Sequence, residues 1–245
     1  MQDRYAADYG DFVKLALLRT LAQDYHVGVA WWRFPNEAHN GDGKHVKYLE
    51  QRDKWRHFDP DLFDSLASVV DEHRRSVQSL QDASLLARAT YVHAEIPAAG
   101  TPATLRRDRL AWFKQTTLAL ADAGIVFADP DNGLEPAGFS PGSKNGGKAI
   151  AFDELRALAT PGRTIIVYHH QTRRKGGHIA EIVHLSECLR GKGFASVDAI
   201  RSARFSPRVF FVLNAAADIR RRMQGYATSW AGHLSWHPCV QAAAL

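Results

Sequence analysis

Two carboxylates and an amide follow a short apolar segment in the middle of the chain. Asp129, Asp131 and Asn132 come directly after residues 124–128, whose β-branched and aromatic side chains are typical of a strand buried on both faces. Pro130 lacks a backbone donor and disfavours a helix at the residue before it, so the strand is predicted to end near Asp129. Open α/β sheets bind ligands at the carboxyl ends of their strands. These residues are therefore candidate catalytic residues, although an acidic turn that only ends a strand would give the same pattern.

Polar residues also follow two other predicted strands. The apolar run 163–168 is followed by His169 and His170, and the run 26–32 is followed by a loop over 35–44. Glycines in that loop allow a ligand to approach the backbone closely, but neither the GxGxxG nor the GxxxxGK[ST] pattern is present. The pattern favours a functional loop without indicating one cofactor. The candidate residues in it are His39, Asn40, Gly41, Asp42 and Gly43.

An aromatic and acidic segment precedes the first predicted helix. Asp11 is the expected N-cap of a helix that runs to about residue 23, with apolar residues recurring at helical spacing. Asp8 lies in the loop before this cap, and Lys14 lies one turn into the helix. The segment either covers a pocket or is a chain end that its tyrosines hold in place.

The basic residues gather in short clusters, and the formal net charge is +5. Lys144 lies in a long glycine-rich loop, which is typical of a lid, and Arg173, Arg174 and Lys175 follow the histidine pair. Clusters near loops favour contact with the phosphates of a nucleic acid or nucleotide. Solvated helix faces would give the same clusters, and both interpretations stay open.

Strands that alternate with helices would bring these groups together. The order predicts an α/β fold, namely a Rossmann-like, mainly parallel sheet covered by helices on both faces. The whole chain is interpreted as one domain with a helical insertion over 45–88. The segments 195–200 and 208–213 are expected to form an antiparallel hairpin at one edge of the sheet. In this arrangement three polar loops meet at one edge: 35–44, 129–133 and 169–174.

The composition is that of an ordinary globular protein. Of the 245 residues, 45% are hydrophobic and 23% are charged. No apolar run approaches the roughly 18 to 20 residues that cross a bilayer, and the first residues lack an apolar signal segment. The two cysteines, Cys188 and Cys239, cannot make a disulfide framework. We therefore expect a cytoplasmic protein with no membrane partner.

Two short motifs carry a resemblance to a known family. Residues 5–14 read Tyr-Ala-Ala-Asp-Tyr-Gly-Asp-Phe-Val-Lys, and Asp129-Pro130-Asp131-Asn132 ends a predicted strand. In both places the chain resembles Rossmann-like S-adenosylmethionine-dependent methyltransferases, nearest the family that methylates adenine N6 in 23S ribosomal RNA. That family has a similar opening and an Asp-Pro-Pro-Tyr motif at the end of its fourth strand. Asp131 and Asn132 stand here in place of the second proline and of the tyrosine that stacks on adenine.

The resemblance implies methyl transfer to an amine of a nucleic acid. Asp129 and the Pro130 carbonyl would accept hydrogen bonds from the amine, and positioning would supply most of the rate. The remaining catalytic candidates are Asp131, Asn132, His169 and His170. The residues implied to bind S-adenosylmethionine are Asp8, Lys14, His39, Asn40, Gly41, Asp42 and Gly43. Those implied to hold the nucleic acid are Lys144, Arg173, Arg174 and Lys175.

Two alternatives remain open from the residues themselves. In a metal-dependent phosphodiesterase or nuclease, Asp129 and Asp131 would be oxygen ligands for Mg²⁺ or Mn²⁺. The histidines after residue 168 would then act as base or ligand. The doubled acid favours this hypothesis, whereas the glycines after the first strand favour the methyltransferase. The third hypothesis is a nucleic-acid-binding protein that keeps the fold and the basic clusters without catalysis.

Overall fold

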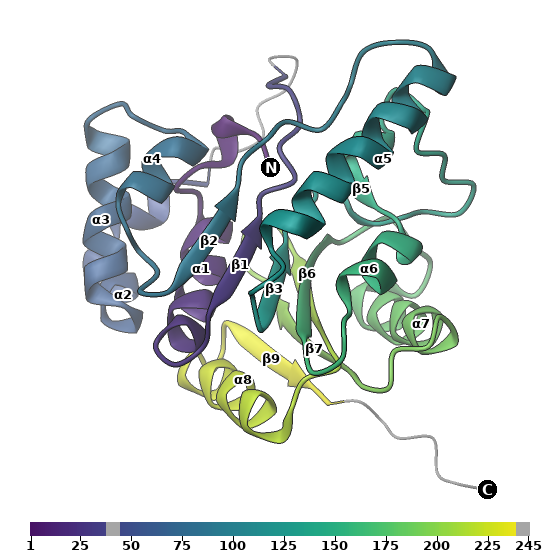
Figure 1. The fold of residues 1–245 in the computed structure, drawn as a ribbon. Coiled ribbons are helices and arrows are strands. Elements are labelled where there is room, and N and C mark those ends of the chain that lie inside the picture. The colour runs from purple at the N-terminus through teal and green to yellow at the C-terminus, as the bar shows by residue number, and fades with distance from the viewer. Residues whose placement is uncertain (38–44, 239–245) are drawn as a thin grey trace, which may run out of the picture.

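A seven-stranded sheet forms the centre of the computed structural model, which describes residues 1–37 and 45–238 (Figure 1). The strands lie in the order β2-β1-β3-β6-β8-β7-β9. They are β1 Val27–Ala30, β2 Ala89–Val92, β3 Ile125–Ala128, β6 Thr164–His170, β7 Val197–Ser202, β8 Arg208–Leu213 and β9 Leu234–His237. Strands β2, β1, β3 and β6 pair in parallel, whereas β8 is antiparallel to both β6 and β7, and β9 is antiparallel to β7.

Helices cover both faces of this sheet, so the predicted α/β class and its mostly parallel central sheet are confirmed (Figure 1). The α-helices are α1 Tyr9–Ala22, α2 Arg52–Trp55, α3 Pro60–Asp71, α4 Val77–Asp82, α5 Pro102–Ala119, α6 Phe152–Leu158, α7 Gly177–Gly191 and α8 Ala217–Ser229. The 3₁₀ helices are η1 Asp3–Tyr5, η2 Lys47–Glu50, η3 Arg56–Phe58 and η4 Gly146–Lys148. Every helix in the described ranges is too short or too polar to cross a membrane.

Alternate residues of the central strands face two different cores. In β3, Ile125 and Phe127 join the core formed with α1, α3 and α8, whereas Val126 and Ala128 join the core formed with α5, α6 and α7. All four side chains are buried. An apolar run without alternation is therefore explained by burial on both faces, which holds this strand firmly at the centre of the sheet.

The first helix begins earlier than predicted. Its N-cap is Asp8, whose side chain accepts a hydrogen bond from the backbone nitrogen of Asp11 at 3.1 Å. The expectation that Asp11 caps the helix was wrong. Asp11 lies in the first turn, where its carboxylate accepts from the backbone nitrogen of Ala7 at 2.9 Å and remains available to a side chain of the same helix.

The segment 45–88 forms short helices and no strand. Its aromatic residues pack against α1: Phe12 stacks on Tyr48 with ring centroids 5.4 Å apart, and Tyr9 meets the Trp55 ring edge-on at 5.1 Å. These helices therefore pack against the amino-terminal half of α1 and help to hold it in place.

One strand, β9, extends the sheet beyond what the sequence predicted. Strands β7 and β8 do pair antiparallel, but they do not form the sheet edge, because β9 pairs with β7 outside them. Strand β6 includes His169 and His170, whose positions pair with Val209 and Arg208 of β8. A partner along its whole length thus keeps β6 extended past the end of its apolar run. A separate two-stranded sheet joins β4 Gly133–Leu134 to β5 Ala149–Ile150.

Candidate functional site

Three parallel strands end side by side at one edge of the sheet. Ala30, Ala128 and Val167 are register neighbours in β1, β3 and β6, so the residues after them emerge at the same edge. The prediction that the three strand ends share one rim is confirmed. A cavity of about 340 Å³, called here the edge cavity, opens there. It is lined by Met1, Tyr5, Asp8, Gly10, Asp11, Lys14, His45, Asp129, Pro130, Asp131, Asn132, Tyr168, His170, Ser206 and Arg208.

The edge cavity lies beside the point where the strand order reverses, on the β3 side. After β1 the chain moves outward to β2, and it then returns to place β3 on the other side of β1. In open α/β sheets such a switch point, at the carboxyl ends of the strands, is the usual ligand position. Trp32, two residues after β1, has a φ of 50°, which is rare for a bulky residue and is found most often at functional sites.

Lys14 connects the first helix to the end of β3. Its Nζ lies 2.6 Å from Oδ2 of Asp129 and 2.6 Å from Oδ1 of Asp11, and all three side chains are buried. Each ion is thereby compensated in a place where an isolated charge would be costly. The arrangement fixes the position of the Asp129 carboxylate relative to α1.

Burial and charge act in opposite directions on this cluster. Burial raises the pKa of Asp11, and although Lys14 opposes that effect, the pKa reaches about 6. For Lys14, burial lowers the pKa, but the carboxylates of Asp11 and Asp129 outweigh it and hold the pKa above its ordinary value. Lys14 is therefore a permanent cation at neutral pH.

Asp131 is held by the first two residues of the chain. The Met1 amino nitrogen lies 2.6 Å from Oδ1 of Asp131, and Nε2 of Gln2 donates to its Oδ2 at 2.6 Å. The same Met1 nitrogen donates to the carbonyl oxygens of Trp32 at 3.0 Å and Asp129 at 3.1 Å. The crevice between the ends of β1 and β3 is thus rich in hydrogen-bond acceptors.

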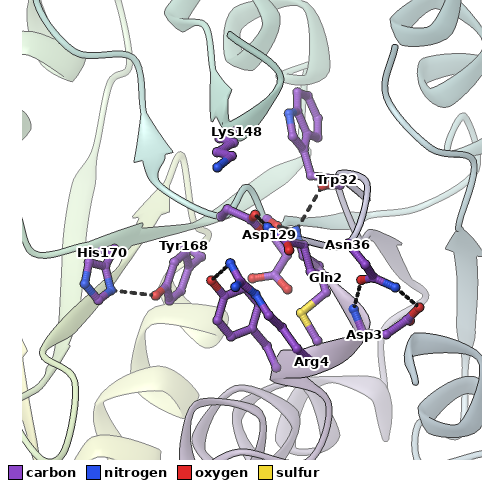
Figure 2. A network of polar contacts seen from close by, with 12 residues as sticks. Gln2, Asp3, Arg4, Trp32, Asn36, Asp129, Lys148, Tyr168 and His170 are labelled. Atoms are coloured by element: carbon purple, nitrogen blue, oxygen red, sulfur yellow. Dashed lines mark hydrogen bonds and ion pairs between the residues drawn. The ribbon is translucent and has the colours of Figure 1, made fainter. Parts of the chain in front are cut away.

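The far wall of the edge cavity comes from β6 and β8. Tyr168 Oη and His170 Nδ1 lie 3.1 Å apart, as Figure 2 shows, and burial raises the pKa of Tyr168 well above its ordinary value. Arg208, at the start of β8, is buried with its Nη1 at 3.9 Å from Oδ1 of Asp8. Gly10 makes room for it, because a Cβ at position 10 would collide with the guanidinium.

His169 does not line the edge cavity. It borders a second cavity of about 880 Å³, called here the α7 cavity, which also includes Glu181, His184 and Cys188 from α7. Its Nδ1 accepts from the backbone nitrogen of Leu134 at 3.1 Å, and its Nε2 lies 3.5 Å from Oε1 of Glu181. The two cavities are adjacent, because Asn132 and His170 line both of them. Both predicted histidines therefore border the α7 cavity, and only His170 also borders the edge cavity.

Glu181 is bound from several sides. Burial raises its pKa, but the hydrogen bonds from His169 and from Thr172 outweigh this and bring the pKa to about 2. The backbone nitrogen of Thr172 donates to both carboxylate oxygens at 3.1 Å. The His169–Glu181 pair thus fastens β4 and the segment after β6 to α7, which is a positioning role.

The structure places the other predicted residues in three ways. Asp129, Pro130, Asp131, Asn132 and His170 come together in the edge cavity with Asp8 and Lys14. Lys144, Arg173, Arg174 and Lys175 are exposed, and Arg174 borders the α7 cavity. The remaining candidates, which are His39, Asn40, Gly41, Asp42 and Gly43, lie outside the described residues.

Several residues of the edge cavity were not predicted. Tyr168 was interpreted as part of a strand, Asp11 as a cap, and Arg208 as the first residue of an edge strand. The signal for Asp11 is its spacing of three residues from Lys14, which brings the two side chains to one helix face. Arg208 meets the cavity only through the antiparallel reversal at β8, for which local sequence gives no signal. Comparison with protein-family models and with curated protein sequences finds no match to this chain.

Proposed function

We propose that the edge cavity is the active site of an S-adenosylmethionine-dependent methyltransferase that acts on an amine of a nucleic acid. The observation that carries the proposal is the position of Asp129 and Pro130. They follow β3 directly and line the cavity beside the switch point. The ion pair between Asp129 and Lys14 joins them to α1, which contains part of the other motif that resembles the family.

The acceptors in the crevice suit the amino-acid part of the cofactor. Asp131 and the carbonyl oxygens of Trp32 and Asp129 together surround the Met1 nitrogen, so this corner accommodates the amine of a methionine. S-adenosylmethionine has the same amine on the same side chain and would supply an activated methyl group. Met1 and the cofactor amine would compete for these acceptors, so the first residues have to shift when the cofactor binds. Asp131 would pair with the cofactor amine, and the buried guanidinium of Arg208 would pair with the carboxylate.

Asp129 and Pro130 present acceptors to the methyl-accepting amine. An ionised carboxylate only accepts hydrogen bonds, and proline offers its carbonyl oxygen without a competing N–H. Two acceptors that hold the amine hydrogens direct the nitrogen lone pair away from them. Since positioning contributes several kcal/mol to such reactions, the rigid placement of Asp129 by Lys14 is the main contribution expected from these residues.

Aromatic side chains from other segments stand in for the missing tyrosine of the family motif. Tyr5 of η1 and Tyr168 of β6 both line the edge cavity. Either ring offers a flat face to a base, whereas Asn132, which occupies the tyrosine position, contributes a polar amide.

The geometry gives less support to a metal-dependent nuclease. Asp129 and Asp131 each contact a cationic nitrogen at 2.6 Å. Among residues 1–37 and 45–238, no three histidine, cysteine or acidic side chains form a group able to hold a metal ion. The doubled acid that suggested this alternative is thus engaged by amino groups.

Ligand binding to the folded protein tests the proposal. S-adenosylhomocysteine is expected to raise the melting temperature of the wild type, because a ligand at about 100 times its Kd stabilises the folded state by about 2.7 kcal/mol. Asp131→Asn removes a charge that the cofactor amine needs and is expected to reduce that shift. Asp129→Asn is expected to keep the shift but to lose methyl transfer from labelled S-adenosylmethionine to RNA.

Two results would reject the methyltransferase. The first is the absence of any shift with S-adenosylhomocysteine. The second is a shift with Mn²⁺, together with Mn²⁺-dependent cleavage of the RNA that Asp131→Asn abolishes, which would establish the nuclease instead. Asp64→Asn, which changes a half-exposed carboxylate paired with Arg52 and Arg56 far from the edge cavity, is the control for both variants.

A further inference from the structure

An exposed aromatic side chain stands beside the edge cavity at the tip of the turn between β7 and β8. Phe205 is 44% exposed, although apolar side chains of this size are usually buried. Its φ of 58° is a true outlier for a bulky residue, so the surrounding contacts must hold it there. The ring lies against Tyr9 at 4.7 Å and His45 at 5.6 Å. His45 lines the edge cavity, and so does Ser206, which follows Phe205 in the chain. Phe205 therefore lies at the rim of this cavity.

Basic side chains lie near this ring, and the Lys54 ammonium is 5.2 Å from the centre of the neighbouring Trp55 ring. Arg204 precedes Phe205, and Lys54 and His57 come from the helices that carry Trp55, whose ring lies 6.0 Å from Phe205. All three are exposed. The His233 ring lies 4.6 Å from Trp55, and its pKa is lowered by burial and then by its electrostatic interaction with Arg204, Lys54 and His57. We call Lys54, His57, Arg204 and Phe205 the rim surface.

We propose that the rim surface binds a single strand of nucleic acid, with one base stacked on Phe205 and the adjoining phosphates on Arg204 and Lys54. A flat ring among cations matches the two parts of such a strand, because every base offers a face and every nucleotide a negative charge. A duplex keeps its bases stacked inside and cannot use the ring. The inference rests on the proposed function in one respect, since the strand would deliver its amine into the neighbouring cavity.

The rim surface differs from the basic residues that the sequence singled out. Lys144, Arg173, Arg174 and Lys175 are exposed without an aromatic partner that the described contacts show. An acidic peptide would satisfy the cations but would leave the ring uncovered. The aromatic side chain therefore favours a strand of nucleotides over another polyanion.

Fluorescence anisotropy with a short labelled oligouridylate tests this surface. Phe205→Leu keeps an apolar side chain on Tyr9 but removes the ring, and is expected to weaken binding about 5- to 160-fold without changing the salt dependence. Lys54→Gln with Arg204→Gln is expected to lower the slope of log K against log salt by about 1.4, since each phosphate contact on a single strand contributes about 0.7. Phe205→Trp is expected to retain binding. The matched controls are Leu118→Ala and Lys114→Gln, which change exposed residues of α5 on the other face of the sheet.

The outcomes separate this inference from the proposed function. Three results would overturn the rim surface. The first is that Phe205→Leu binds oligouridylate as tightly as the wild type does. The others are that the wild type binds an RNA duplex, or polyglutamate, as tightly as it binds oligouridylate. Normal binding with the expected losses, but no response to S-adenosylhomocysteine, would keep the rim surface and reject the methyltransferase. Methyl transfer by Phe205→Leu with an unchanged KM for RNA would keep the methyltransferase and reject the rim surface. Thermal melting of each variant verifies that it is folded.

Discussion

Lys14 Nζ and Asp129 Oδ2 lie 2.6 Å apart in the interior, although 115 positions separate the two residues in the chain. The contact joins the first helix to the end of the central strand. Asp11 is a second partner of the same ammonium. The residues that line the edge cavity therefore also hold the core of the fold together.

Loss of the Lys14 charge is expected to destabilise the fold strongly. Lys14→Met leaves two buried carboxylates without a cation, and breaking a buried ion pair in this way costs about 3–5 kcal/mol. Urea denaturation at pH 7 measures the loss. Lys114→Met, an exposed change on α5, is the matched control and should stay within about 0.5 kcal/mol of wild type. A loss as small as that of the control would show that the carboxylates are not buried as described.

Asp11 is expected to make stability fall between about pH 4 and pH 6. Burial raises its pKa from 3.8 to about 6, so in that range the folded chain binds more protons than the unfolded chain. The stabilisation is complete below the unfolded value and is lost as the pH rises through about 6. Two pKa units correspond to about 3 kcal/mol. Asp11→Asn keeps an oxygen for the Ala7 nitrogen but cannot titrate, so the wild-type free energy of unfolding should decline relative to the variant across this window. Parallel curves would contradict the prediction.

Glu181 is expected to contribute in the opposite sense. Its hydrogen bonds from His169 and Thr172 bring its pKa to about 2, despite the upward effect of burial, so its stabilisation is present above about pH 4.5 and is lost as the pH falls toward 2. Glu181→Gln should cost about 2–3 kcal/mol at pH 7 and should flatten the acid limb of the stability curve. Acid denaturation followed by circular dichroism measures both. An unchanged acid limb would mean that the carboxylate is not held by these donors.

Arg109 is expected to hold the segment between β4 and β5. Its guanidinium pairs with Glu154 at 2.6 Å and donates to the carbonyl oxygens of Gly146 at 2.6 Å and Ala149 at 2.7 Å. Arg109→Ala removes all three contacts, so amide hydrogen exchange should rise over residues 135–148 more than elsewhere. Arg107→Ala, a neighbouring exposed change, should leave that segment as in wild type. Uniform exchange in both variants would contradict an anchoring role.

The order of the central elements was predictable because burial on both faces leaves a clear pattern. The apolar run before Asp129 identified β3, and the polar residues after β1, β3 and β6 identified the edge where the cavity opens. The class of fold follows from these runs and the helices between them. Strand β9 was missed, because the apolar–polar alternation of Leu234 to His237 covers only four residues at the end of the chain, and its pairing with β7 is not visible in the sequence.

The members of the site were harder to predict than its place. His169 and His170 are adjacent in a strand, so their side chains point to opposite faces, and only His170 reaches the edge cavity. Arg109 belonged to a basic cluster in the sequence, yet its charge is buried against Glu154. The role of a charged residue depends on the partner that the fold brings to it, and that partner is often far along the chain.

The distance in sequence between Lys14 and Asp129 also bears on how the protein is made. At about 5–20 residues per second, a ribosome needs roughly 6–23 s to add the 115 residues between them. During that interval the Lys14 ammonium lacks the β3 carboxylate, and the apolar face of the α1 segment lacks β3 and the later strands of its core. The period before β3 is synthesised is therefore the stage at which the nascent chain would benefit most from a chaperone.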